Sequence, residues 1–261
     1  MTWQETKLGD CIDTLKGYAF KSQWYCNEGL PLVKVSNFTE DSIDTSDLDF
    51  IPDEIAKSYL KYRLQTDDVV IQTVGSWATN PQSVVGKVIR VPRKANGALL
   101  NQNAVKILPK SAVDRNFLFY RLKSSDFKNY IIGCGQGAAS QASITLDAIR
   151  AFNFQLPLME EQRRIAAILS AYDDLIENNT RRIGILEEMA RRIYEEWFVR
   201  FRFPGHEHVP LVESEHGLIP EGWRLVLRKV NSCRKVLASC TLQAWQGHHN
   251  SSSSRLTNCA L

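Results

Sequence analysis

Hydrophobic residues recur in alternating steps of four and three from residue 165 to residue 197. These steps keep successive side chains on one side of a helix, and two helices can pair along such a seam. At 1.5 Å per residue the seam is roughly 50 Å long, too long for a domain of about 150 residues to bury. We therefore expect a long coiled-coil-type helix over residues 156–203 that packs against a second helix. The predicted pairing residues are Ile165, Leu169, Tyr172, Ile176, Asn179, Ile183, Leu186, Ala190, Ile193 and Trp197.

The pattern in residues 1–155 is different. Short β-rich runs alternate with Gly, Pro and Asn turn signals, and helical periodicity appears near residues 52–62 and 116–130. This mixture predicts an α+β domain with a mixed or mostly antiparallel sheet. A short strand at 152–156 should lead into Pro157 and the long helix.

Two further segments follow the helix. Residues 204–223 are rich in Pro, Gly, His and Glu, which indicates a linker. Residues 224–261 have scattered cysteines, a serine run and no periodicity, so we expect this segment to be disordered. The pair His206 and His208 could contribute to a metal site, but no third ligand is suggested, and a solvated linker is the favoured interpretation.

Composition restricts the function only weakly. The 32 basic and 29 acidic residues give a formal net charge of +3, too small to identify a nucleic-acid binder. Ten basic residues and only two acidic ones nevertheless lie between Lys87 and Lys128. Such a segment could form a positive face that attracts a phosphate backbone, although a solvated surface explains the charges equally well.

The six cysteines lack the spacing of a zinc site, and no apolar run is long enough to cross a membrane. With no signal peptide at the start, the sequence predicts a reduced, cytoplasmic protein. Asn80-Pro81-Gln82-Ser83 is similar to the base-gripping loop of amino-methyltransferases, but its second proline and its aromatic residue are missing. No nucleophile, general base or metal set stands out, so we predict a chain without catalysis, metal or cofactor.

The helical segment resembles the conserved region of type I restriction-modification specificity subunits. The resemblance rests on the run from Leu156 to Leu169, on Asp173 and Asn179 after it, and on residues 186–201. Upstream, weaker anchors resemble the target recognition domains of that family. These anchors are Leu8-Gly9-Asp10, Gly17-Tyr18-Ala19-Phe20, Gly29-Leu30-Pro31-Leu32-Val33, Asp68-Val69-Val70-Ile71, Asn101-Gln102 and the loop from Gly137 to Ile144.

The resemblance implies a non-catalytic subunit that recognises double-stranded DNA. In that family two recognition domains read the halves of a split site, and helices hold modification subunits that methylate adenine; a restriction subunit is a further partner. This chain carries one recognition domain and one helix, and Gly217 to Trp223 resembles the entry to a second domain of which only 38 residues follow. We therefore expect a truncated or half-length subunit, in which residues 224–261 are the truncated or frame-shifted start of a second recognition domain. Two such chains should form a homodimer through the long helix and read a palindromic split site.

Within such a recognition domain, polar side chains on loops should read base edges while basic side chains hold phosphates. The first predicted loop comprises Gln72, Thr73, Ser76, Trp77, Asn80 and Gln82, and the second comprises Gln136, Ser140 and Gln141. The predicted phosphate contacts are Lys87, Arg90, Arg93 and Lys94. Trp77 could equally be a core residue or a lid.

Besides an inactive remnant whose tail drives degradation, two other functions fit the same sequence. One is a coiled-coil adaptor between proteins that does not bind DNA, which an absence of salt-dependent DNA binding would favour. The other is the remnant of a single-chain methyltransferase-nuclease, which catalytic domains encoded just upstream in the same frame would favour.

Overall fold

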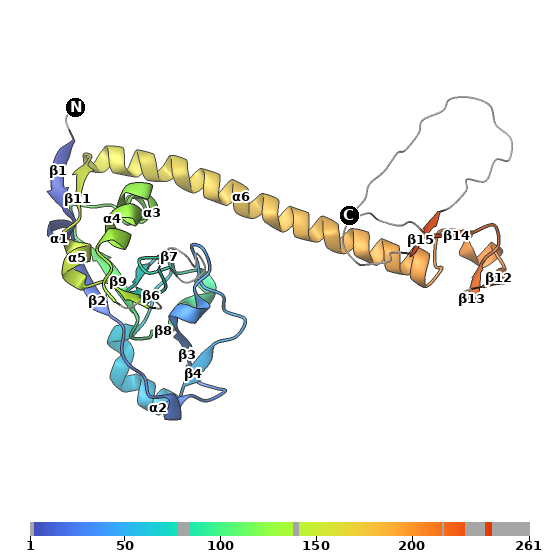
Figure 1. The fold of residues 1–261 in the computed structure, drawn as a ribbon, viewed down its shortest axis with the longest axis horizontal. Helices are drawn as coiled ribbons and strands as arrows, with labels where there is room; N and C mark the ends of the chain where they lie inside the picture. The colour runs from blue at the N-terminus through green and yellow to red at the C-terminus, as the bar shows by residue number, and fades with distance from the viewer. Residues whose placement is uncertain (1–2, 78–83, 138–140, 216, 228–237, 242–261) are drawn as a thin grey trace. The chain divides into compact units, whose positions relative to one another are not determined.

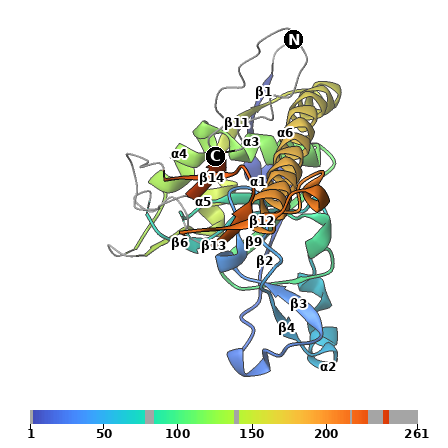
Figure 2. The ribbon, with the colours of Figure 1, turned by 90° about the vertical axis from the view of Figure 1, so that its right-hand side faces the viewer.

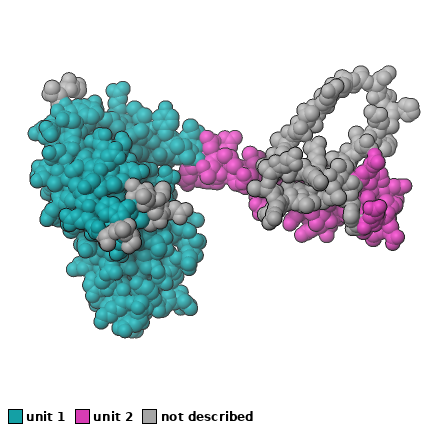
Figure 3. Space-filling model, viewed as in Figure 1, with its two compact units in different colours: residues 1–176 teal, residues 177–261 magenta. Residues whose placement is uncertain are grey.

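The computed structural model describes residues 3–77, 84–137, 141–215, 217–227 and 238–241. The chain divides into two units, residues 1–176 and residues 177–261 (Figure 3). The predicted site residues Asn80, Gln82 and Ser140 lie outside the described residues.

The main sheet of the first unit is built from the apolar runs of the sequence. Val69 and Ile71 pack in one hydrophobic cluster and Val70 in another, because successive side chains of a strand point to opposite faces. Every neighbouring pair of strands in this sheet is antiparallel. In spatial order the strands are β2 (Ile12–Lys16), β9 (Ala104–Pro109), β5 (Val69–Gln72) and β7 (Val88–Arg90).

A second sheet lies toward the other end of this unit, beside α2 (Asp53–Ala56), as Figure 2 shows. Its strands are β4 (Asp49–Ile51), β3 (Leu30–Val33) and β8 (Leu99–Leu100). The central strand β3 is antiparallel to β4 and parallel to β8. The predicted α+β class with mixed and antiparallel sheets is therefore confirmed.

The helical pattern near residues 116–130 forms two helices, α3 (Arg115–Lys123) and α4 (Ser125–Gly133), where the sequence suggested one stretch. The Asp114 carboxylate accepts hydrogen bonds from the first backbone N–H groups of α3, and the Ser124 hydroxyl does the same for α4. Because Ser124 adopts an extended conformation suited to an N-cap, it ends one helix and begins the next.

The N-terminal strand returns to the end of the domain. β1 (Gln4–Lys7) pairs antiparallel with β11 (Asn153–Leu156), the strand that leads into the long helix. Two short helices, α1 (Leu8–Cys11) and α5 (Leu146–Arg150), lie beside this pair. A smaller pair joins β6 (Val74–Gly75) to β10 (Ala142–Ser143).

The long helix α6 (Met159–Tyr194) begins after Pro157, as predicted (Figure 1). Its first turns pack on the domain through Gln162 and Ala166, both buried. It continues as a π-helical turn, Glu195–Val199, so the helical backbone ends four residues before the predicted end at residue 203. Phe198, Phe201 and Phe203 then pack around the buried Trp223, with ring centroids 5.2–5.7 Å apart.

The second unit differs from the expected linker in one respect. Within residues 204–223, β12 (Leu211–Ser214) and β13 (Gly217–Pro220) form an antiparallel hairpin. Gly217 has a φ of 108°, a conformation that glycine adopts without steric cost and that permits the tight reversal. In the segment expected to be disordered, β14 (Arg224–Leu227) pairs with β15 (Ala238–Thr241), and the rest of that segment lies outside the described residues.

Candidate nucleic-acid interface

The structure brings the two predicted DNA-reading loops together. Strand β6 in the first loop pairs with β10 at the end of the second, and Ser143 pairs with both Val74 and Gln136. The backbone N–H of Ile144 also donates to the carbonyl oxygen of Thr73 at 2.9 Å. Two segments separated by more than 60 positions therefore share one ribbon, which sequence alone could not establish.

The residues at the base of this ribbon face the protein. Gln72 and Thr73 are only 2% and 3% exposed, and the Gln72 side-chain amide donates to the carbonyl oxygen of Val74 at 2.9 Å. In this conformation neither side chain reaches solvent, so they are placed to support the loops. Ser76, Gln136 and Gln141 retain accessible surface and keep the predicted orientation toward solvent.

Trp77 is half-buried and packs against the larger hydrophobic cluster of the domain. A Cβ atom on Gly135 would lie 3.1 Å from its indole ring, so the indole covers the backbone of the second loop. The structure thus favours the interpretation of Trp77 as a core residue, although part of its side chain stays accessible.

Glycine at position 137 is required by the backbone. Its φ is 142°, and an added Cβ would lie 2.2 Å from the carbonyl oxygen of Gln141. We expect Gly137→Ala to lower the free energy of unfolding by about 1–3 kcal/mol, because the loop must shift out of a conformation that alanine cannot adopt. Chemical denaturation measures the effect.

Gly133→Ala is the matched control. An added Cβ there meets no atom within 4 Å, and the residue ends α4, so the change should be neutral or slightly stabilising. If both substitutions lowered the free energy of unfolding equally, the stability effect at Gly137 would not come from the conformation of the second loop.

A groove of about 960 Å³ lies beside the first loop. Three lysines line it: Lys87 comes from the segment before β7, Lys123 from α3 and Lys128 from α4. Its apolar wall includes Val84, Val85 and Leu122, and Glu40 is the acidic residue among its lining. Burial lowers the pKa of Lys87, opposed by the nearby Glu40 carboxylate. A cation that is partly desolvated in this way gains from an approaching anion.

The four predicted phosphate contacts do not form one cluster. Lys87 lines the groove, whereas Arg93 and Lys94 are exposed on a short 3₁₀ turn after β7. Sequence reasoning did not select Lys123 and Lys128, although they belong to the same run of basic residues. Lys123 is the last residue of α3, and Lys128 lies in α4, which begins after Ser124. Both helices therefore contribute a lysine to the groove.

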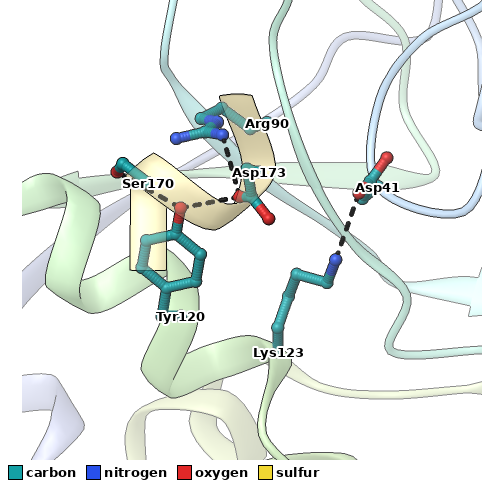
Figure 4. Close-up of polar contacts among 6 residues, drawn as sticks. All are labelled: Asp41, Arg90, Tyr120, Lys123, Ser170 and Asp173. Atoms are coloured by element: carbon teal, nitrogen blue, oxygen red, sulfur yellow. Dashed lines mark hydrogen bonds and ion pairs between the residues drawn. The ribbon is translucent and has the colours of Figure 1, made fainter. Parts of the chain in front are cut away.

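Arg90 is directed to the long helix (Figure 4). Its guanidinium lies 3.4 Å from the Asp173 carboxylate and stacks over the Phe119 ring at 4.7 Å. The Tyr120 hydroxyl donates to the same carboxylate at 2.6 Å and lies 3.2 Å from Ser170 Oγ. Burial, followed by the hydrogen bond to Asp173, raises the pKa of Tyr120, which keeps the hydroxyl protonated as a donor.

The described residues contain neither a candidate metal site nor a candidate membrane span. Within those ranges, no group of three His, Cys, Asp or Glu side chains is placed to hold a metal ion. The His206 ring contacts the Phe203 carbonyl oxygen at 2.8 Å. In the same part of the chain, no helix has the length and hydropathy needed to cross a bilayer.

Solved structures of type I restriction-modification proteins share the fold of this chain. A chain from a structure of type I R-M complex assembly superposes with a TM-score of 0.51 at 20% identity, covering 78% of this chain and 46% of its own. The S subunit from M. genitalium gives 0.50 at 16% identity, covering 76% and 46% respectively. These likenesses concern the fold.

Residues 1–188 match the type I restriction modification DNA specificity domain, and the chain belongs to this family. It is 27% identical over 225 residues to a putative type I restriction enzyme MjaX specificity subunit of Methanocaldococcus jannaschii, covering 86% of this chain and 51% of that protein. With the MjaIX specificity subunit of the same organism it is 31% identical over 131 residues, covering 50% and 30%. The chain thus spans about half the length of the curated relatives it matches.

Proposed function

We propose that this chain is the non-catalytic DNA-recognition subunit of a type I restriction-modification complex. The family match over residues 1–188 carries the proposal. In this role the chain works in the cytoplasm with modification subunits and, for cleavage, a restriction subunit. It selects the DNA site at which the modification subunits methylate adenine.

The ribbon of β6 and β10 and the adjoining groove are the proposed DNA-binding face. Gln136 pairs with Ser143 of the ribbon, Ser76 directly follows β6 and Gln141 directly precedes β10. Asn80, Gln82 and Ser140 lie outside the described residues and stay predicted base-reading residues. Lys87, Lys123 and Lys128 supply cations along the groove, and a phosphate backbone would gain from the partly desolvated charge of Lys87. Gln72 and Thr73 support the loops, Trp77 closes the second loop, and Arg93 and Lys94 contribute long-range attraction.

Pairing of two chains through α6 completes the proposal. The apolar side chains of the seam from Leu169 to Trp197 are 37–63% exposed in the single chain. A second copy of the same helix, packed antiparallel, would cover this seam and would relate two identical recognition domains by a two-fold axis. The proposed target is consequently a split, palindromic site.

The test is to express the chain with its modification subunit in a methylation-free host and to map methylated adenines by long-read sequencing. A palindromic motif with two half-sites separated by a fixed spacer supports the proposal. No methylated motif, in the presence of soluble complex, contradicts it. An assembled complex that shows no salt-dependent binding to DNA would instead support the adaptor function.

Lys87→Ala should weaken binding to all DNA sequences about equally. It should also reduce the slope of log affinity against log salt by about 1, because one phosphate contact releases about one counterion. Fluorescence anisotropy of the complex on cognate and random duplexes at several salt concentrations measures both quantities.

Lys57→Ala is the matched control for that change, because Lys57 is exposed and lies near α2, away from the groove lining. It should leave the affinity and the salt slope unchanged. If Lys87→Ala altered the preference for a single base position instead, the assignment of Lys87 to the phosphate backbone would be wrong.

A further inference from the structure

The contact between the domain and the long helix contains two separate polar anchors. The first is the buried side chain of Gln162, which is 1% exposed. Its oxygen accepts from the backbone N–H of Asp114 at 2.8 Å, and its amide donates to the carbonyl oxygens of Ala112 at 3.1 Å and Pro157 at 2.9 Å. This anchor fixes the start of α6.

The second anchor lies further along the helix, at Asp173 (Figure 4). One carboxylate oxygen accepts from the Tyr120 hydroxyl at 2.6 Å and lies 3.4 Å from the Arg90 guanidinium. Ser170, one turn earlier, contacts the same hydroxyl at 3.2 Å. The helix is thereby joined to α3 and to the end of β7 at one point.

Residues outside the helix hold this anchor in place. The guanidinium of Arg90 stacks 4.7 Å above the Phe119 ring. The backbone N–H of Arg90 donates to the carbonyl oxygen of Asp41 at 2.8 Å, and the Asp41 carboxylate pairs with Lys123 at 3.2 Å. The anchor is thus continuous with α3, which carries the groove residue Lys123, and with β7, which directly follows Lys87.

Two anchors separated along a helix fix its direction, whereas one anchor leaves a pivot. The 11 residues from Gln162 to Asp173 span about 16 Å along the axis. The 24 residues from Asp173 to Trp197 span about 36 Å, so a tilt of about 10° at the domain would move the far end of the seam by about 6 Å. That is about two base pairs of DNA, at about 3.4 Å each.

We propose that Asp173, held by Tyr120 and Arg90, is a positioning residue that sets how far apart the two half-sites of the DNA target can lie. Through the helix direction, this anchor determines which spacer length the paired subunits accept. Base identity is read elsewhere, on the ribbon. The proposal rests on the proposed function, because a spacer exists only if two recognition domains act on one split site.

Long-read methylation mapping of Asp173→Ala and Tyr120→Phe tests the proposal. Both variants should keep the half-site sequences of the wild type. The share of methylated sites whose spacer is one or two base pairs too long or too short should rise at least ten-fold. Asp173→Asn, which keeps an acceptor for Tyr120, should rescue most of the wild-type selectivity. Asp174→Asn is the matched control, because Asp174 is exposed and adjacent in sequence, and it should keep the wild-type spacer.

A second measurement does not depend on methylation. Spin labels are attached through an unnatural amino acid at the exposed Lys57 and Arg182, and their distance distribution is measured by pulsed electron resonance in spin-diluted protein. The distribution should be broader in Asp173→Ala and Tyr120→Phe than in the wild type, whereas Asp174→Asn should leave it unchanged. Thermal melts of each variant verify that the domain remains folded.

The outcomes separate the two proposals. The role of Asp173 is overturned if the wild-type protein methylates a split site and the variants keep the same single spacer. A variant that methylates less, but only at that unchanged spacer, overturns it as well. Distance distributions unchanged by Asp173→Ala also overturn it. If the wild type methylates no split motif, the proposed function fails, and the distance measurement alone decides whether Asp173 orients the helix.

Discussion

Replacing Leu186 with Glu is expected to abolish pairing of the chain and, with it, methylation of a split site. Leu186 lies on the predicted seam and is 62% exposed in the single chain. Because the interface is two-fold, the substitution removes one leucine from each chain. Burying each leucine contributes about 2 kcal/mol, so the loss of about 4 kcal/mol weakens dimerisation about a thousand-fold. The introduced carboxylates add a desolvation cost. Light scattering at micromolar concentration and methylation mapping measure the two effects.

Asn178→Glu provides the control for this prediction. It adds the same charge to an exposed position of α6 that is outside the alternating seam. Mass and methylation should match those of the unchanged protein. A wild-type chain that is monomeric at micromolar concentration would contradict pairing through α6, as would a Leu186→Glu chain that remains dimeric.

Replacing Lys106 with Met is expected to lower the free energy of unfolding by about 3 kcal/mol, since it leaves a carboxylate buried without its closest cation. Lys106 Nζ lies 2.7 Å from Asp68 Oδ2, and the two residues are 8% and 3% exposed. The same ammonium donates to the carbonyl oxygen of Arg63 at 3.0 Å. Arg115, 3.9 Å from the other carboxylate oxygen, offsets part of the loss. Urea denaturation at neutral pH measures the change.

The same substitution at Lys110 isolates the effect of burial. Lys110 pairs with Asp13 at 3.6 Å, but their side chains are 42% and 71% exposed, so water screens the pair and Lys110→Met should cost less than about 1 kcal/mol. A similarly small cost for Lys106→Met would show that solvent reaches Asp68 and compensates its charge.

Much of the fold could be predicted from local patterns. Short β-rich runs predicted β3, β5, β7 and β9 but not β2, β4 or β8, and the 4-3 seam predicted a helix that begins just after Pro157. The end of that helix was placed four residues too late, because packing of Phe198, Phe201 and Phe203 around Trp223 is not visible in periodicity. The hairpin at 211–220 was missed because its strands are short and largely exposed.

The proposed DNA-binding face could be predicted only in part. The sequence singled out polar loops near residues 72–82 and 136–141, but their pairing through β6 and β10 required the folded chain. Burial of Gln72 and Thr73 was equally invisible, since a polar residue type does not reveal which face of a strand it occupies. For the other residues predicted to read base edges, that role stays a prediction.

The sequence by itself determined the family, the α+β class and the exposed apolar seam, because these depend on residue type and spacing along one segment. Only the tertiary structure decided that Lys87, Lys123 and Lys128 share a groove and that Arg90 turns toward Asp173. A charge acts most strongly on what lies within a few ångströms, and the Asp173 carboxylate that Arg90 meets is 83 positions away along the chain. Which basic side chains remain available to DNA is therefore a property of the fold.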